Sequence, residues 1–210
     1  MRDGGYDVGY RAVSCFWGTE PSSLVKLFLS DIRPSGTGRV LDLGCGEGKN
    51  AAAFAEAGYL VDAIDCSSAA IENGRKQFPI QRVNWTVGDV LSYSSPDDSY
   101  DIVVAYGLAH CLSDAEEVEH LVKLMRRLTK PSGYNILCTF NDRSHDLSAH
   151  PGFAPLLLPH SFFTMLYQDW TRITSTDDTI HETHPHNGIP HHHSVTRILA
   201  KKPNATPLST

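Results

Sequence analysis

The stretch that decides the fold of this chain is RVLDLGCGEGKN, residues 39–50. A short apolar run ends in an acid and is followed by three alternating glycines, Gly44, Gly46 and Gly48. Glycine has no Cβ and adopts positive φ without strain, so the backbone at such a strand-to-helix turn can lie directly against a ligand. The stretch therefore predicts a nucleotide-cofactor pocket in an α/β domain.

The residues around the glycines distinguish between nucleotide cofactors. A dinucleotide brings a pyrophosphate, and its fingerprint has a third glycine three residues after the second, where this chain has Lys49. Asp42 and Glu47 place two carboxylates beside the turn, which repel a diphosphate and attract a cation. S-adenosylmethionine carries an ammonium and a sulfonium group and no phosphate, so the local charge favours it over NAD.

Three later segments agree with this interpretation. Residues 59–65 form a second apolar strand that ends in Asp65, where a carboxylate can accept from both ribose hydroxyls. A third strand, residues 83–90, ends in a turn at Gly88 and Asp89, whose carboxylate can accept from an adenine amino group. Residues 100–106 are apolar almost throughout, as expected of a parallel strand covered on both faces.

Together these motifs resemble those of a class I S-adenosylmethionine-dependent methyltransferase, over residues 39–140. The resemblance implies an enzyme with one Rossmann-like α/β domain, whose seven-stranded, mostly parallel sheet has the order 3-2-1-4-5-7-6 and ends in an antiparallel hairpin. It implies methyl transfer from S-adenosyl-L-methionine to a small-molecule acceptor, with S-adenosyl-L-homocysteine as the product. The cofactor residues that follow from it are Asp42, Gly44, Cys45, Gly46, Asn50, Asp65, Cys66, Ser67, Gly88, Asp89, Val90 and Ala105.

The remaining elements follow from apolar periodicity and from helix start and stop signals. A capping box at residues 113–116 predicts the start of one helix. The expected helices span residues 21–32, 48–57, 68–78, 114–128 and 160–170, a fifth strand spans 134–140, a polar lid loop spans 141–159, and a final hairpin uses 171–180 and 194–201. The domain organisation expected is an N-terminal lid or cap at 1–37, a methyltransferase domain at 38–202 and a disordered tail at 203–210.

The composition fits a small enzyme domain. With 210 residues, 41% of them hydrophobic, the chain can bury a substantial core. Its net charge of −6 argues against a nucleic-acid partner, because neutralising phosphates needs a basic face. The five cysteines form no C-x-x-C pair, and no apolar run is typical of a signal peptide or a membrane span. We expect a cytoplasmic monomer or homodimer that does not bind membranes.

Two regions outside the cofactor motifs predict where the acceptor binds. The first is an aromatic lead-in containing Tyr6, Tyr10, Phe16 and Trp17. It either folds over the cofactor, since aromatic faces suit a cationic methyl donor, or packs on the sheet and covers an edge.

The second region, residues 181–193, holds six of the eleven histidines. His184 and His186 alternate, as do His191 and His193, so each pair can share one face of a strand. The pattern fits a divalent-metal site, substrate-binding donors and bases, or an exposed polar hairpin loop.

Four further residues are candidates for the reaction itself. Tyr106 and His110 follow the fourth strand, and carboxyl ends of strands line the crevices of open α/β sheets, so His110 is a candidate base or simply a packed helix-start residue. A looser resemblance of residues 170–202 to tellurite-resistance methyltransferases implies a small acceptor, such as a chalcogen oxyanion, near His181 and Arg197. The competing hypothesis is a metal-binding or sensing protein built on the same scaffold.

Overall fold

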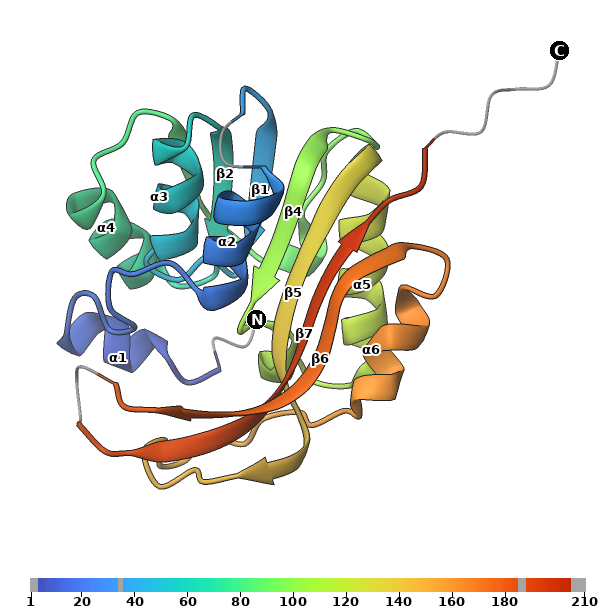
Figure 1. The fold of residues 1–210 in the computed structure, drawn as a ribbon. Helices are drawn as coiled ribbons and strands as arrows, with labels where there is room; N and C mark the ends of the chain where they lie inside the picture. Colours follow the sequence, from blue (N-terminus) through green and yellow to red (C-terminus); the bar gives the residue numbers. More distant parts are fainter. Residues whose placement is uncertain (1–3, 34–35, 185–187, 205–210) are drawn as a thin grey trace, which may run out of the picture.

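The computed structural model describes residues 4–33, 36–184 and 188–204 and contains a single seven-stranded sheet. The strand order is β3-β2-β1-β4-β5-β7-β6, which confirms the order that the resemblance implies (Figure 1). The strands are β1 Arg39–Leu43, β2 Leu60–Asp65, β3 Val83–Val87, β4 Tyr100–Tyr106, β5 Thr129–His145, β6 Thr171–Glu182 and β7 His191–Lys201.

The sheet has a parallel part and an antiparallel part. Strands β3, β2, β1, β4 and β5 run parallel, whereas β7 pairs antiparallel with both β5 and β6. The last three strands have 11 to 17 residues, compared with five to seven in the others. They therefore extend beyond the body of the sheet as a curved ribbon, which carries the histidine-rich end of the hairpin (Figure 1).

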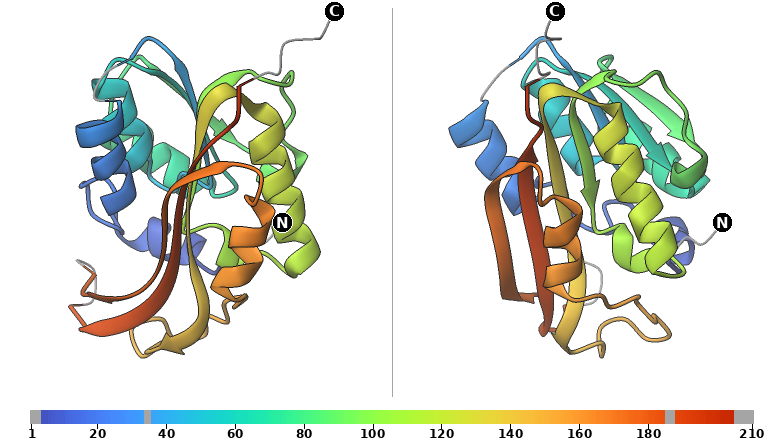
Figure 2. Two further views of the ribbon diagram at one scale, coloured as in Figure 1. Left: turned by 45° about the vertical axis from the view of Figure 1, so that its right-hand side comes forward. Right: turned by 90° about the vertical axis from the view of Figure 1, so that its right-hand side faces the viewer.

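Helices cover both faces of the sheet and bury an apolar layer on each (Figure 2). On one face, α5 (Ala115–Leu128) directs Val118, Leu121, Val122 and Met125 into the core, at the i, i+3, i+4, i+7 spacing of an amphipathic helix. The short helix α6 (His160–Leu166) packs on the same side through Phe163. The other face is covered by α2 (Ser23–Leu27), a wider helical turn at Phe28–Ile32, and α3 (Lys49–Glu56).

Several expected boundaries are displaced. The cap of α5 is Asp114 and not Ser113, because the Asp114 carboxylate accepts from the backbone N–H of Glu117 at 2.9 Å. Strand β5 starts five residues before the expected 134 and ends five after the expected 140, because pairing with β4 and β7 extends it in both directions. As a result, part of the expected lid loop is strand. Separately, α6 ends four residues before the expected 170.

The N-terminal segment forms a short helix, α1 (Asp7–Ala12), beside α4 (Ser68–Gln77) (Figure 1). The Ser67 hydroxyl, which caps α4, donates to the Asp7 carboxylate at 2.7 Å. Asn73 of α4 donates to the backbone carbonyl of Tyr10 at 2.7 Å. These bonds hold the aromatic lead-in over the carboxyl ends of β1 and β2.

Candidate active site

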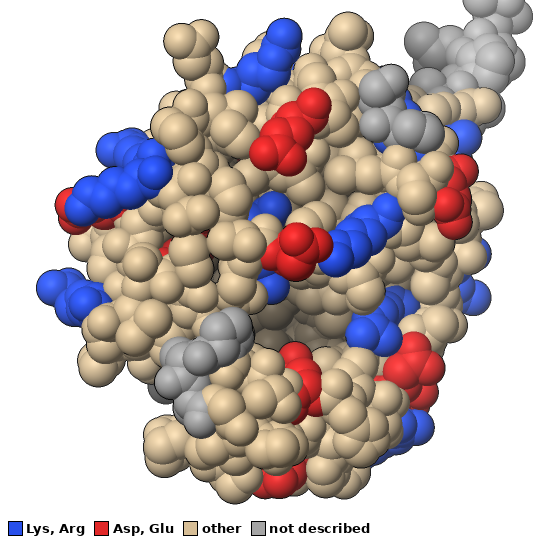
Figure 3. Space-filling view, turned by 60° about the vertical axis from the view of Figure 1, so that its left-hand side comes forward, with Lys and Arg blue, Asp and Glu red and all other residues tan. Residues whose placement is uncertain are grey.

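The described residues enclose a cavity of about 480 Å³ between the glycine turn and the last three strands. Its size lies in the range of small-molecule and cofactor sites. Figure 3 shows the molecular surface hollowed, with charged side chains of both signs around the hollow. Six of the twelve predicted cofactor residues line the cavity, namely Gly44, Cys45, Gly46, Asn50, Asp65 and Cys66.

The glycine turn has the backbone that its sequence predicts. Gly44, Gly46 and Gly48 have φ of 67°, 54° and 79°, a region that side chains with a Cβ rarely adopt. A Cβ on Gly46 would lie 2.9 Å from the Tyr10 hydroxyl. The turn thus needs glycine both for its conformation and for the close approach of the N-terminal segment.

Asp65 ends β2 inside the cavity and is held in place by backbone donors. Its carboxylate accepts from the N–H of Gly46 at 2.8 Å and from the N–H of Ser67 at 2.9 Å. A carboxylate has about four acceptor positions, so both oxygens retain capacity for further hydrogen bonds. The position next to the glycine turn is the one expected for the acid that binds a ribose.

The remaining predicted cofactor residues do not line the cavity. Asp42 is buried, its pKa is raised to about 7 by burial and next by the charge of Asp65, and its Oδ2 has no hydrogen-bond partner among the described residues. Asp89 accepts from the N–H of Leu91 at 3.0 Å and so caps a short helical turn. The cavity wall does not extend to Asp42, Ser67, Gly88, Asp89, Val90 or Ala105.

Glu47 has a role that differs from the expected one. The sequence suggested that its charge attracts the cofactor, but its two oxygens accept from the backbone N–H of Cys15 at 2.8 Å and of Phe16 at 2.6 Å. The side chain of Asn73 donates to the same carboxylate at 3.0 Å. Glu47 therefore fastens the N-terminal segment to the glycine turn, and nothing in the local sequence pattern indicates these partners 31 and 32 residues away.

The aromatic lead-in forms one wall of the cavity. Tyr6, Tyr10 and Trp17 line it, whereas Phe16 packs against the Tyr10 ring at a centroid distance of 5.8 Å and does not. The indole N–H of Trp17 donates to the Tyr10 hydroxyl at 3.0 Å, and Lys49 donates to the Trp17 carbonyl at 3.0 Å. Of the two possibilities for this segment, the structure favours folding over the cofactor turn.

All four candidate reaction residues line the cavity. Tyr106 at the end of β4 and Arg197 in β7 both line the cavity, and the Nε of Arg197 is buried with no hydrogen-bond partner in the described part of the chain. The Tyr106 hydroxyl bonds to Ser23 at 3.2 Å, and burial raises its pKa. His181 also borders the cavity but is exposed.

His110 also lines the cavity, but it is buried in an arrangement that does not suit a general base. Its ring stacks on Phe140 with centroids 4.1 Å apart, and its Nδ1 accepts from the backbone N–H of Phe140 at 3.1 Å. In the neutral ring the proton is therefore on Nε2, which can only donate. Burial, and next the neighbouring His145 and His150, lower the pKa of His110 to about 3, so the sequence-based proposal of a base is disfavoured.

Replacing His110 by asparagine should weaken the pH dependence of stability. Asparagine can still accept from Phe140, but it does not titrate. With histidine at position 110, the unfolded chain binds a proton there below pH 6.5, whereas the folded chain does so only below about pH 3. The free energy of unfolding therefore falls as the pH drops, by about 2 kcal/mol at pH 5. Urea unfolding at pH 7 and pH 5 should show that the free energy of unfolding falls by about 2 kcal/mol less in the variant than in the native protein.

The matched control is His120→Asn, which changes an exposed histidine of α5. It should retain the pH dependence of the native chain. A His110→Asn protein whose stability falls between pH 7 and pH 5 as steeply as that of the native protein would show that His110 is not held neutral.

The histidines of the hairpin lie on opposite sides of its two strands. His191 and His193, at the start of β7, are buried on one side of the strand, while His192 pairs with His181 on the other at a ring distance of 5.9 Å. His184, just after β6, is buried and lines the cavity, whereas His186 lies outside the described residues. His150, which no spacing in the sequence singled out, joins them from the loop after β5.

Comparisons with known proteins place this architecture in a class. Residues 40–133 match the family described as a methyltransferase domain. TehB from Haemophilus influenzae superposes with a TM-score of 0.71 at 20% identity, covering 95% of this chain and 66% of that one. A Burkholderia thailandensis 1,6-didemethyltoxoflavin-N1-methyltransferase, solved with S-adenosylhomocysteine, gives a TM-score of 0.63 at 18% identity over 87% of this chain and 78% of that one.

Among curated relatives, a protein named Hemagglutinin 1 from Eikenella corrodens is 27% identical over 192 residues, 88% of this chain and 60% of that protein. A demethylmenaquinone methyltransferase from Renibacterium salmoninarum is 28% identical over 128 residues, 60% of this chain and 48% of that protein. The chain thus spans about half to three-fifths of the length of these relatives.

Residues 40–133 match a methyltransferase domain, and the glycine turn and the sheet order are those of the class I S-adenosylmethionine-dependent methyltransferase fold. This confirms the resemblance seen in the sequence and the cofactor it implies. The comparisons do not support a metal-sensing protein in place of an enzyme. None of the helices in the described ranges has both the length and the apolar character needed to cross a membrane.

Proposed function

We propose that this protein transfers a methyl group from S-adenosylmethionine to a small-molecule acceptor. The observation that carries the proposal is one continuous cavity, which has the glycine turn and Asp65 at one end and Tyr106, Arg197 and buried histidines at the other. This arrangement lets a cofactor and an acceptor lie end to end. The names of two similar proteins, which refer to demethylmenaquinone and to 1,6-didemethyltoxoflavin, support a small acceptor.

The reaction depends mainly on the positioning of the nucleophile relative to the methyl group. A methyl group bound to a sulfonium is attacked in line, so holding the nucleophile at near-attack distance supplies much of the rate. Tyr6, Tyr10 and Trp17 would exclude water and face the cationic sulfur. Arg197, whose Nε has no hydrogen-bond partner among the described residues, would bind an electron-rich or anionic part of the acceptor.

A labelling experiment tests this function. The protein is incubated with S-adenosylmethionine carrying a radioactive methyl group and with a cell extract, which is then separated into small molecules, protein and nucleic acid. We expect label in the small-molecule fraction, and loss of that label when excess S-adenosylhomocysteine is added. Label confined to protein or nucleic acid would overturn the proposed acceptor class, and no transfer to any fraction, despite cofactor binding, would overturn the proposed activity.

A further inference from the structure

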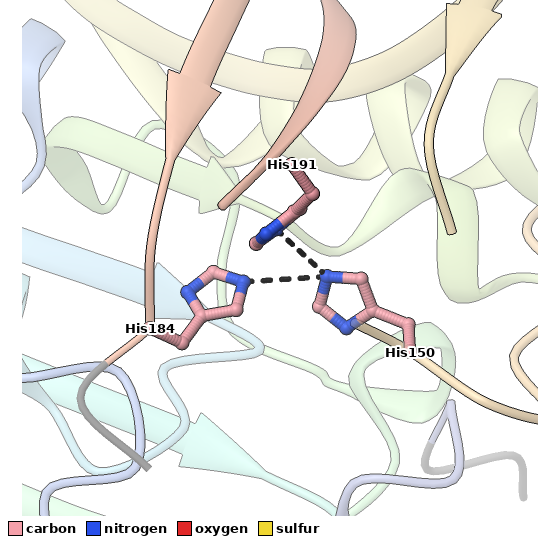
Figure 4. A group of neighbouring side chains, drawn as sticks. All are labelled: His150, His184 and His191. Atoms are coloured by element: carbon pink, nitrogen blue, oxygen red, sulfur yellow. Dashed lines mark hydrogen bonds between the residues drawn. The ribbon is translucent and has the colours of Figure 1, made fainter. Parts of the chain in front are cut away.

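Five side chains converge at the wall of the cavity formed by the histidine-rich hairpin. His150 comes from the loop after β5, Glu182 and His184 from the end of β6, and His191 and His193 from the start of β7. The Nε2 of His150 lies 3.3 Å from the Nε2 of His184 and 3.3 Å from that of His191 (Figure 4). Glu182 Oε1 lies 3.9, 3.7 and 3.8 Å from the Nε2 atoms of His184, His191 and His193.

Hydrogen bonds outside this group determine which nitrogen of His191 faces it. The Nδ1 of His191 is 2.8 Å from the carbonyl oxygen of Ile189, which can only accept. Nδ1 therefore carries the proton, and in the neutral ring Nε2 presents a lone pair to the cluster. An outer hydrogen bond to a carbonyl of this kind is how proteins orient histidine ligands of metals.

Hydrogen bonds through the His145 ring determine in the same way which nitrogen of His193 carries the proton. The Nε2 of His145 is 2.6 Å from the carbonyl of Asn141 and so carries a proton, which leaves its Nδ1 as an acceptor. His193 Nδ1, 3.2 Å away, donates to it. The Nε2 of His193 is then a second lone pair, and it is fully buried with no hydrogen-bond partner among the described residues.

This arrangement brings several hydrogen-bond acceptors close together. The two lone pairs and the Glu182 carboxylate are all acceptors, and His150 Nε2 has at most one proton to offer to two neighbours at equal distance. A cation bound by His150, His184, His191 and Glu182 would give these close acceptors a positively charged partner. Nitrogens bound tetrahedrally to zinc at 2.0–2.1 Å lie about 3.3–3.4 Å apart, which matches the observed 3.3 Å spacing.

We propose that His150, His184 and His191 bind a divalent transition-metal ion through their Nε2 atoms, with Glu182 as the fourth ligand and His193 beside it. Imidazole nitrogens favour zinc, nickel, copper or iron over magnesium and calcium. The site differs from the sequence-based hypothesis, because His150 and Glu182 complete it and His186 lies outside the described residues. His150, Glu182 and His184 also line the cavity, so the ion would lie in its wall.

The site can be tested by metal binding to untagged protein that has been stripped with a chelator. Zinc is titrated in competition with a chromogenic chelator. We expect one ion per chain with a dissociation constant of about a micromolar or tighter. His191→Ala should weaken binding at least about 100-fold, since loss of an outer-shell partner alone costs 10–100-fold. X-ray absorption at the zinc edge should report three imidazole ligands.

The matched control is the double variant His181→Ala and His192→Ala, which removes two histidines from the same strands on the side away from the cluster. It should bind zinc within threefold of the native chain. Equal loss in the control and in His191→Ala, no stoichiometric zinc in the native chain, or fewer than two imidazoles in the absorption spectrum would each overturn the proposal. Binding of S-adenosylhomocysteine by His191→Ala serves as the folding check and keeps this test independent of the proposed methyl transfer.

Discussion

Replacing Asp65 by alanine is expected to weaken binding of S-adenosylhomocysteine about 100-fold. The ribose hydroxyls would lose a charged acceptor, and hydrogen bonds to charged groups contribute about 1.5–3 kcal/mol each. The N–H groups of Gly46 and Ser67 would also lose their common partner, which loosens the glycine turn. A hundredfold change corresponds to about 2.8 kcal/mol and is readily measured by isothermal titration calorimetry.

Asp62→Ala provides the matched control from the same strand. Asp62 bonds to Arg39, Asn84 and Tyr100 and does not line the cavity. This variant should bind S-adenosylhomocysteine within threefold of the native protein, although it will be less stable. If Asp65→Ala and Asp62→Ala bind equally well, the assignment of the ribose site to Asp65 is wrong.

Replacing Glu47 by alanine is expected to release the N-terminal segment. The change removes the acceptor of the Cys15 and Phe16 N–H groups and of Asn73, and unsatisfied part-buried donors cost about 1–3 kcal/mol each. We expect the free energy of unfolding in urea to fall by about 3 kcal/mol. Affinity for S-adenosylhomocysteine should fall at least about tenfold, because Tyr10 and Trp17 leave the cavity wall.

Limited proteolysis distinguishes a released segment from general instability. Cleavage of Glu47→Ala should begin within the first 20 residues, before the sheet is attacked. Glu20→Ala is the control, because Glu20 is exposed and pairs only with Lys26 in the described contacts. A Glu47→Ala chain that resists early N-terminal cleavage would contradict the role assigned to this carboxylate.

The parallel half of the fold could be predicted because its signals are local. Gly44 to Gly48 fix the turn, and apolar runs at 59–65 and 100–106 mark buried strands, as the structure has them. The ends of β5 could not be predicted, since its start depends on pairing with β4 and its end on pairing with β7, about 50 residues away in the sequence. The cap at Asp114 was missed because Ser113 offers an equally acceptable local pattern.

The candidate site was predictable only in part, for the same physical reason. Asp65 is the last residue of β2, so its position depends on local sequence. Glu47 and His150 act through partners 31 to 41 residues away, and no spacing rule connects them to those partners. His110 has the expected place near β4, but its buried hydrogen bond to Phe140 decides its chemistry, and burial cannot be read from one residue's neighbours.

Isothermal titration of the native protein with S-adenosylhomocysteine tests the central claim most directly. The cavity with Gly46 and Asp65 at one end predicts a single site per chain with a micromolar to submillimolar dissociation constant, in the usual range for enzymes and their small ligands. The absence of binding at millimolar ligand would contradict the assignment of this cavity to the cofactor and, with it, the proposed methyl transfer.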